Sequence, residues 1–373
     1  MPAAPRTRLR PRGGHEPRRP AGRREQTTGR ERDMSGHSRN RPGEMGRGRR
    51  LAVWLGAPVL LALGLVLATE RGTGQANPFA GRRLYVDPAS PARRQADAWA
   101  RSRPRDAALL RLIAEQPQAI WIGDWARDVR REVDNRVTEI SRAGALPVFV
   151  VYNIPHRDCG LHSAGGARSG DDYRRWIIAF SQGLRRRPAV VILEPDGLPS
   201  LDCLPARFQD ERYVLLREAV QTLRAGGASV YIDAGNANWK QPPVIADRLR
   251  KAGIELANGF ALNVSNFHAE QVNVAYGERV SRLVGGKHFV IDTSRNGRGT
   301  AVVREWCNAR NQALGRAPTT RTGHALVDAY LWVKTPGESD GTCNGGPRAG
   351  AWWPDYALEL SQAAQALGSL APR

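Results

Sequence analysis

Cysteine is scarce in this 373-residue chain, which contains only Cys159, Cys203, Cys307 and Cys343. No two of them form a CxxC pair, and this argues against a zinc ribbon. The chain also lacks a GxSxG nucleophile elbow, an HExxH motif and any comparable histidine spacing. These absences argue against an elbow-type serine hydrolase and against a metal-dependent hydrolase. The glycines at 165 and 166 lack the strand–loop–helix context of a phosphate-binding loop.

A dense basic stripe is also absent, although the formal net charge is +20. Residues 1–50 hold 15 arginines against 5 acidic residues, whereas residues 77–373 hold 40 basic and 30 acidic residues. The only basic run in the longer part, Arg185–Arg187, is interpreted as a solvated helix end before Pro188. This distribution argues against nucleic acid as a partner of the longer part, since such a partner requires a concentrated basic surface.

The N-terminal region lacks the periodic apolar residues of a folded domain. Residues 1–50 are rich in Arg, Gly and Pro, and we expect a basic disordered arm there. Arg47, Arg49 and Arg50 lead into Leu51–Ala68, an apolar run without a charge. This pattern predicts a signal peptide with a short linker over residues 51–76, and a retained membrane anchor is the alternative. Either reading places residues 77–373 outside the cytoplasm, where two disulfides can form.

Residues 77–373 contain no internal repeat and no Gly/Ser-rich or Pro/Thr-rich linker, so we expect a single domain. Short apolar runs alternate there with amphipathic segments. The predicted strands are Ala119–Ile122, Pro147–Tyr152, Val190–Leu193, Val230–Ile232, Gly259–Asn263, His288–Ile291 and Ala329–Val333. The predicted helices include Val129–Arg142, Tyr173–Leu184, Arg212–Arg224, Gln271–Leu283 and one from Pro354 to about Leu367. This alternation predicts an α/β fold, a distorted β/α barrel of about seven parallel strands.

Acidic residues follow five of the predicted strands. They are Asp158, Glu194 with Asp196, Asp233, Asp292, and Glu338 with Asp340. In a parallel barrel the C-terminal strand ends meet at one mouth, so these carboxyls are expected to crowd together. Repulsion and burial raise the pKa of a crowded carboxyl, which can then remain protonated and act as a general acid. Any single one of them is more often a carboxylate that caps a helix or holds a loop.

Aromatic residues occur close to the same loops: Trp121, Tyr152, Trp239, Trp306 and Trp332. Flat aromatic faces suit the apolar C–H faces of sugar rings, although core packing is the common alternative for any one tryptophan. Cleavage of a glycosidic bond requires a pair of carboxyl groups, and aromatic side chains beside them can bind the sugar rings.

At these positions the chain resembles glycoside hydrolase family 6, the cellulase family of endoglucanases and cellobiohydrolases. The matching segments are Val150–Gly166 (VVYNIPHRDCGLHSAGG), Ile192–Leu198 (ILEPDGL), Tyr231–Trp239 (YIDAGNANW), Asn263–Phe267 (NVSNF), Ile291–Gly297 (IDTSRNG), Glu305–Asn308 (EWCN) and Leu331–Gly341 (LWVKTPGESDG). They occur in the order of the family and cover essentially all of residues 77–373.

The resemblance implies hydrolysis with inversion at the anomeric carbon. It assigns the general acid to Asp196, and gives Asp158 the tasks of raising the pKa of Asp196 and relaying a proton. Asp340 would be the base, acting through water, or the charge that stabilises the transition state. Tyr152 would press on the sugar at the reactive position, and Ser163 would hold the relay water. The family often has a second serine where this chain has Ala164, which leaves the water path open.

The resemblance also implies substrate contacts and covalent links. Trp121, Trp239 and Trp306 would line glucose positions, and Asn263, Lys334 and Glu338 would complete the substrate-binding set. The implied disulfides join Cys159 to Cys203 and Cys307 to Cys343.

The expected partner is therefore a β-1,4-glucan, with no cofactor, no metal and no nucleic acid. The membrane would be a partner only through an N-terminal anchor. The stretch between Asp292 and Trp306 and the tail after Asp340 are short, which favours an open cleft and cleavage within chains. We therefore expect a secreted, monomeric endo-β-1,4-glucanase. The alternatives are a cellobiohydrolase, a glucan-binding protein without catalysis, and an envelope- or nucleic-acid-binding protein acting through the basic arm.

Overall fold

The computed structural model describes residues 76–299 and 305–370, which belong to one compact unit. The predicted basic arm and, apart from Ala76, the predicted signal or anchor segment lie outside the described residues. Within the described part, no helix is both long enough and apolar enough to cross a bilayer.

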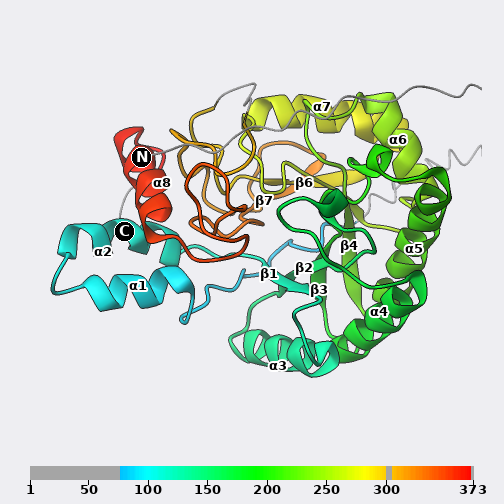
Figure 1. The fold of residues 1–373 in the computed structure, drawn as a ribbon, viewed down its shortest axis with the longest axis horizontal. Helices are drawn as coiled ribbons and strands as arrows, with labels where there is room; N and C mark the ends of the chain where they lie inside the picture. The colour runs from blue at the N-terminus through cyan, green and yellow to red at the C-terminus, as the bar shows by residue number, and fades with distance from the viewer. Residues whose placement is uncertain (1–75, 300–304, 371–373) are drawn as a thin grey trace, which may run out of the picture. The chain divides into compact units, whose positions relative to one another are not determined.

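Seven strands form one parallel sheet in which each strand pairs with its neighbour in the sequence. They are Ile120–Gly123 (β1), Val148–Tyr152 (β2), Ala189–Leu193 (β3), Ala228–Asp233 (β4), Gly259–Leu262 (β5), His288–Asp292 (β6) and Val327–Leu331 (β7). All seven predicted strands are present, with bounds that agree within two residues. The sheet curls into the distorted barrel that the sequence predicted (Figure 1).

The barrel has a seam between its first and last strands, which do not pair with each other in the described sheet. Two hydrogen bonds cross this seam. The amide of Ala119 donates to the carbonyl of Trp332 (3.0 Å), and the indole Nε1 of Trp121 donates to the carbonyl of Val333 (2.7 Å). They tie β1 to the chain that leaves β7, so the last strand delivers its following loop to the same mouth as the first.

Five helices cover the outside of the sheet: Val129–Arg142 (α3), Gly170–Leu184 (α4), Ala206–Ala225 (α5), Pro242–Lys251 (α6) and Glu270–Leu283 (α7). They follow one another around the barrel in Figure 1. α3 shows how the sequence forms them: the Asp128 side chain accepts the amide of Arg131 at the N-terminus, and Val133, Val137 and Ile140 are buried on one face.

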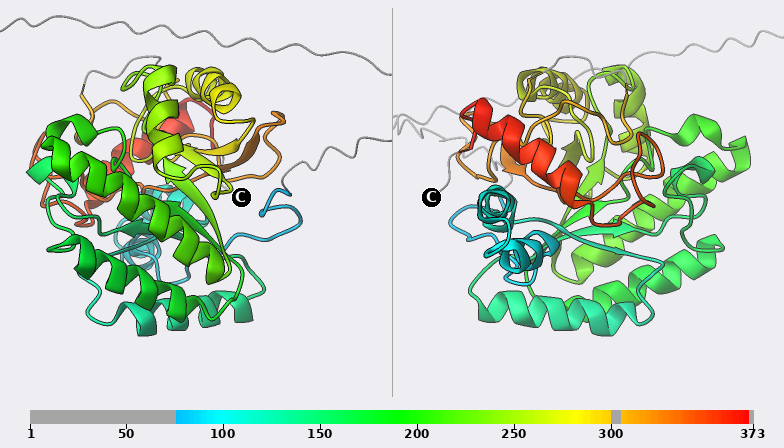
Figure 2. Two further views of the ribbon diagram at one scale, coloured as in Figure 1. Left: turned by 90° about the vertical axis from the view of Figure 1, so that its right-hand side faces the viewer. Right: turned by 60° about the vertical axis from the view of Figure 1, so that its left-hand side comes forward.

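Three further helices form a separate group beside the barrel: Pro91–Trp99 (α1), Pro104–Ala114 (α2) and Pro354–Ala366 (α8). α8 packs on α2 and α1, although they come from opposite ends of the described chain (Figure 2). The sequence predicted α8 but not α1, α2 or α6, which are short and begin at a proline. Proline is well tolerated at the first position of a helix because its missing amide is not needed there.

Alternate residues of each strand face two different apolar layers. Phe149 and Val151 of β2 pack outward against the helices, whereas Val148 and Val150 point into the barrel. Phe79, which is fully buried, belongs to the inner layer and lies 6.1 Å from the ring of Tyr231. Because both faces of the sheet are covered, the strands are apolar throughout, which is why they could be recognised in the sequence.

Candidate active site

The C-terminal ends of the strands open into a cavity of about 1100 Å³. Asp158, Asp196 and Asp340, which come from the loops after β2, β3 and β7, all line it. The structure thus brings the three acidic residues singled out in the sequence into one cleft rather than onto separate faces.

The seven carboxyls expected at this mouth form two tiers. Asp158, Asp196, Glu338 and Asp340 line the cavity, whereas Glu194, Asp233 and Asp292 are at most 1% exposed and lie outside its lining. The lower tier binds backbone amides. Asp292, for example, accepts the amides of Ser265 and Lys334 at 3.0 Å each. The three carboxyls of the lower tier therefore have the structural role that is common for such residues, which is to hold loops. The loops that they hold carry the four carboxyls of the upper tier.

Asp196 is held in an unusual backbone conformation directly after β3. Its φ is +67°, and its amide donates to Oδ2 of Asp233 (2.9 Å). The Ser200 hydroxyl also donates to the Asp196 carbonyl (2.5 Å). Burial raises the pKa of the Asp196 carboxyl well above its usual value, and the nearby Asp233, Asp158 and Asp340 raise it further. A raised pKa favours the protonated form of this carboxyl, which a general acid requires.

Asp233 is a site residue that sequence reasoning noticed after a strand but left without a role. Burial raises the pKa of Asp233 to about 7, and Asp292 adds to the effect against two backbone hydrogen bonds. Oδ2 accepts the amides of Asp196 and Gly235, but Oδ1 is buried and has no hydrogen-bond partner among the described residues. Asp233 raises the pKa of Asp196 more than Asp158 does. The sequence offered no signal for this order, because it depends on distances across strands.

The loop that carries Asp158 is strained and tightly held. His156, Asp158 and Cys159 all have φ between +52° and +57°, a region that non-glycine residues rarely adopt. Asp158 accepts the amide of Ser163 through Oδ2 (2.6 Å). Burial raises the pKa of the Asp158 carboxyl despite this hydrogen bond. Ser163 lines the cavity, and its backbone contributes the amide that binds Asp158 and a carbonyl that accepts a hydrogen bond from Arg157.

Arg157 holds the loop together, a role that the sequence did not reveal. Its guanidinium, which is almost fully buried, donates to Oδ1 of Asp124 (2.9 Å), the carbonyl of Tyr152 (2.8 Å) and the carbonyl of Ser163 (2.8 Å). It also lies 4.6 Å from the ring centre of Tyr152. One side chain thereby connects the loops after β1 and β2 and packs on Tyr152, the residue expected at the reactive sugar.

Asp340 has the opposite electrostatic character to Asp196. Burial favours the neutral form, but Arg295 and Lys334 outweigh it and hold the pKa of Asp340 below its usual value. Arg295 is fully buried and donates to Oδ2 (2.8 Å), the Asn308 amide donates to the same oxygen (2.9 Å), and Lys334 Nζ lies 3.5 Å from Oδ1. Asp340 is therefore a charged carboxylate whose oxygens are already engaged.

Four of the five aromatic residues predicted near the loops line the cavity: Trp121, Tyr152, Trp239 and Trp306. Trp121 is half-buried and meets the ring of Tyr152 edge-on at 5.2 Å. Trp239 and Trp306 are 37% and 47% exposed. Trp332, which the sequence placed among the aromatics near the loops, does not reach the cavity. It is 1% exposed, packs with the α1, α2 and α8 helices, and donates from Nε1 to the carbonyl of Arg316.

The expected polar substrate ligands divide in the same way. Lys334 and Glu338 line the cavity, and burial raises the pKa of the Glu338 carboxyl. Asn263 does not line it. Its side chain is fully buried and donates to the carbonyl of Asp292 (2.9 Å), so its amide supports the loops after β5 and β6. A polar residue after a strand can serve either purpose, and the sequence could not distinguish them.

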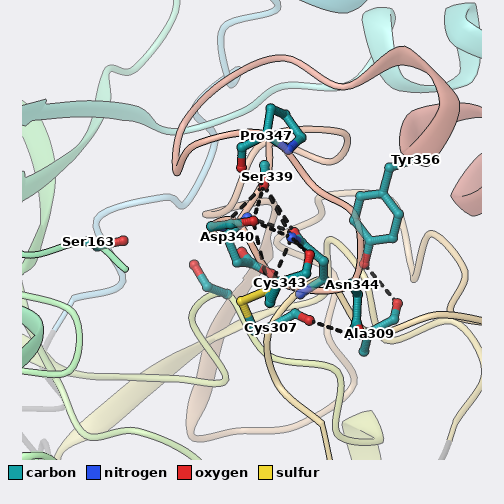
Figure 3. The surroundings of a disulfide bond; sticks show 12 residues. Ser163, Cys307, Ala309, Ser339, Asp340, Cys343, Asn344, Pro347 and Tyr356 are labelled. Atoms are coloured by element: carbon teal, nitrogen blue, oxygen red, sulfur yellow. Dashed lines mark hydrogen bonds between the residues drawn. A yellow bond between two sulfur atoms is a disulfide. The ribbon is translucent and has the colours of Figure 1, made fainter. Parts of the chain in front are cut away.

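Both disulfides form with the pairing that the resemblance implied, Cys159 with Cys203 and Cys307 with Cys343. The second lies beside Asp340 and Ser339 (Figure 3). Among the described residues, the one group of potential metal ligands is His162 with Cys307 and Cys343. Since those two sulfurs are bonded to each other, the group offers no thiolate to a metal.

Comparisons with known proteins agree with this geometry. Residues 79–364 match the profile of glycosyl hydrolases family 6. Endoglucanase A of Cellulomonas fimi is 47% identical over 285 residues, covering 76% of this chain and 61% of the relative. Endoglucanase 1 of Streptomyces halstedii is 40% identical over 315 residues, covering 81% of this chain and 95% of the relative.

A solved structure is also similar to this chain. It is that of the endoglucanase Cel6 from Mycobacterium tuberculosis, in complex with methyl-cellobiosyl-4-deoxy-4-thio-β-D-cellobioside. Its sequence is 45% identical and its fold matches with a TM-score of 0.74, over 78% of this chain and 100% of that chain. The region that the family profile matches, residues 79–364, contains all seven strands and the residues that line the cavity.

Proposed function

Because the chain belongs to glycosyl hydrolases family 6, we propose that it is an endo-β-1,4-glucanase that cleaves internal bonds of cellulose-type glucan. The observation that carries the proposal is the contrast between two carboxyls of one cleft. The pKa of Asp196 is raised well above its usual value by burial and by its acidic neighbours, whereas Arg295 and Lys334 keep the pKa of Asp340 low. A protonated acid facing a fixed negative charge is the arrangement that glycosidic cleavage requires.

In the proposed reaction, Asp196 donates its proton to the glycosidic oxygen as the bond to the anomeric carbon breaks. Water attacks that carbon from the opposite face, so the configuration inverts. The proton that this water loses passes through solvent to Asp158, whose pKa is raised by burial. Tyr152, at the end of β2, is close enough to Asp196 and Asp158 for both carboxyls to raise the pKa of its hydroxyl. It supports the distorted sugar at the reactive position.

Asp340 is better suited to stabilise charge than to accept a proton. A base must bind a proton readily, but Arg295 and Lys334 hold the pKa of Asp340 below its usual value, and Arg295 and the Asn308 amide both donate to its Oδ2. Its negative charge can instead stabilise the oxocarbenium-like transition state. We therefore favour the charge role over the base role for Asp340.

Endo action is favoured over the alternative, a cellobiohydrolase of the same family. Relatives at 47% and 40% identity are endoglucanases, and the stretch from Asp292 to Trp306 is too short for a long roof over the cleft. Part of that stretch, residues 300–304, lies outside the described residues. The alternative of a glucan-binding protein without catalysis is disfavoured because Asp158, Asp196 and Asp340 are all present in one cleft.

Export from the cytoplasm is the proposed location. The two disulfides support it, since such bonds persist in oxidising compartments. The basic residues and apolar run over residues 47–68 support it independently. N-terminal sequencing of the exported protein shows whether that run is removed or retained as an anchor.

The decisive experiment is hydrolysis of carboxymethylcellulose by the purified protein, with the Asp196→Asn variant as the negative control. We expect an early fall in viscosity, and a product that first appears by NMR as the α-anomer. Mixed-linkage β-glucan and xylan define the substrate range. Release of cellobiose without the viscosity fall would establish the cellobiohydrolase alternative, and an initial β-anomer would refute inversion.

A further inference from the structure

Trp125, which the proposed mechanism does not use, is an unusually exposed indole in the cleft. It is 53% exposed, more than either Trp239 or Trp306, and it lines the same cavity as Asp196. Large apolar side chains that remain exposed in a cleft commonly mark a binding surface.

The backbone fixes Trp125 in place. It occupies the third position of a tight turn, in which the amide of Ala126 donates to the carbonyl of Gly123 (3.0 Å). The indole lies over Gly123, where an added Cβ would come within 2.4 Å of the ring. A residue with a side chain at position 123 would therefore push the indole away. The lack of a side chain there keeps the ring close to the end of β1.

A buried cation holds the indole from a second direction. The Arg157 guanidinium lies 5.5 Å from the ring centre of Trp125 and 4.6 Å from that of Tyr152. The same guanidinium pairs with Asp124 at 2.9 Å, directly before Trp125. Cation–π contacts of this kind orient an aromatic ring. Trp125 is thus positioned before any ligand binds, and more than half of it remains available for contact.

The strand order places Trp125 on the outer flank of the cleft. Asp196 follows β3 and Tyr152 ends β2, whereas Trp121 and Trp125 belong to β1 and its following turn, at the edge of the sheet. Trp239 follows β4, on the other side of Asp196. A glucan chain that runs from β3 toward β1 therefore passes Tyr152 and then reaches the β1 side. There Trp121 contacts Tyr152 edge-on, and Trp125, beyond the end of the strand, is the more exposed of the two tryptophans.

From this placement we propose that Trp125 forms an additional sugar-binding position, which takes the third glucose ring from the cleaved bond on the β1 side. The inference rests on the proposed function and extends it by defining the length of chain that the cleft recognises. A position for a third ring serves cleavage within a chain, because an enzyme that releases only two rings from an end has no use for it on that side.

The test compares two oligosaccharides of different length. Cellotetraose, bound with two rings on each side of the cleaved bond, does not reach Trp125, whereas cellopentaose can place a third ring there. We expect Trp125→Ala to lower kcat/KM for cellopentaose about fivefold, a typical scale for one aromatic contact, and to leave the value for cellotetraose unchanged. Trp125→Phe should recover most of the loss. Ile178→Ala, at an exposed apolar position on α4 that does not line the cavity, is the matched control.

Cleavage in ¹⁸O-labelled water adds a readout that a general loss of structure would not move. Water adds to the anomeric carbon, so the label marks the fragment that provided this carbon at the cleaved bond. The size of the labelled fragment therefore reports how many rings lay on that side of the bond. We expect Trp125→Ala to shift the ratio of labelled cellotriose to labelled cellobiose from cellopentaose. An equal loss on both substrates, or an unchanged ratio, would overturn the additional position while the proposed function stands. A wild-type protein that hydrolyses neither substrate would overturn both.

Discussion

At the scale of single residues, the cleft gives two aspartates different pKa values because their surroundings differ. Asp196 and Asp340 are chemically identical, yet one faces other carboxyls and the other faces two cations. The difference comes from Arg295 and Lys334 on one side and from Asp233 and Asp158 on the other. One kind of residue can therefore supply both the proton donor and the fixed charge of a hydrolytic reaction.

Replacing the proposed acid gives the sharpest prediction at this scale. Asp196→Asn retains the shape of the side chain but cannot donate the required proton, so kcat should fall by at least about two orders of magnitude. Binding of glucan oligosaccharides should remain close to that of the wild type, as measured by calorimetry. Substrates with an activated leaving group, which need little protonation, should lose much less activity. Near-normal hydrolysis of cellulose-type glucan by this variant would refute the assignment.

At the scale of loops, two disulfides hold the segments that carry the upper carboxyls. Cys159 directly follows Asp158, and its bond to Cys203 joins the loop after β2 to the one after β3. Cys307 precedes Asn308, whose amide binds Asp340. The bridges close loops with sequence separations of 44 and 36 residues. Each therefore constrains the unfolded chain and also fixes an acidic residue of the cleft.

Removing one bridge should consequently affect both stability and rate. For Cys159→Ser/Cys203→Ser we expect a loss of about 3–4 kcal/mol in the free energy of unfolding, measured by urea denaturation. At a temperature where circular dichroism shows the variant to be folded, kcat should also fall, because the strained Asp158 backbone loses its covalent support. The Cys307→Ser/Cys343→Ser variant is the comparison for loop length. An unchanged urea midpoint in either double variant would contradict the prediction.

The loops were only partly predictable from the sequence. The seven strands could be located because each is a short apolar run, and the acidic residues after them could be grouped at one mouth. Whether such a residue lines the cavity or binds amides beneath it depends on loop paths, as Asp292 and Asn263 show. The tight turn that presents Trp125, and the links that Arg157 makes between two loops, have no local sequence signal.

At the scale of the whole molecule, the buried carboxyls make stability depend on pH. Burial raises the pKa of Glu194 and of Asp233 to about 7, whereas both groups titrate near 4 in an unfolded chain. Between these values the folded protein binds more protons, so the free energy of unfolding falls as the pH rises from about 4 to about 7. Asp340, with its lowered pKa, acts in the opposite sense and loses its contribution as the pH falls below about 4.

We therefore expect stability to be greatest near pH 4 to 5 and lower at pH 8. Urea denaturation across this range measures the slope. A variant at Glu194 tests the contribution of one buried carboxyl to this slope. Both oxygens of Glu194 accept the amide of Asn153, and one also accepts that of Ile154, so a change of this side chain disturbs these hydrogen bonds as well. Glu194→Gln should be less stable at pH 5 but show a shallower decline between pH 5 and pH 8. A decline as steep as that of the wild type would show that Glu194 does not titrate in this range.

By itself, the sequence determined the seven strands, four of the five outer helices and the identity of the acidic and aromatic residues at the mouth, because these follow from apolar periodicity and from residue types at strand ends. Tertiary structure decided how each residue behaves. The raised pKa of Asp196, the charge of Asp340 and the exposure of Trp125 depend on neighbours that are distant along the chain. Local pattern records chemical type and spacing, whereas burial and electrostatic interaction are set by distances that exist only once the chain has folded.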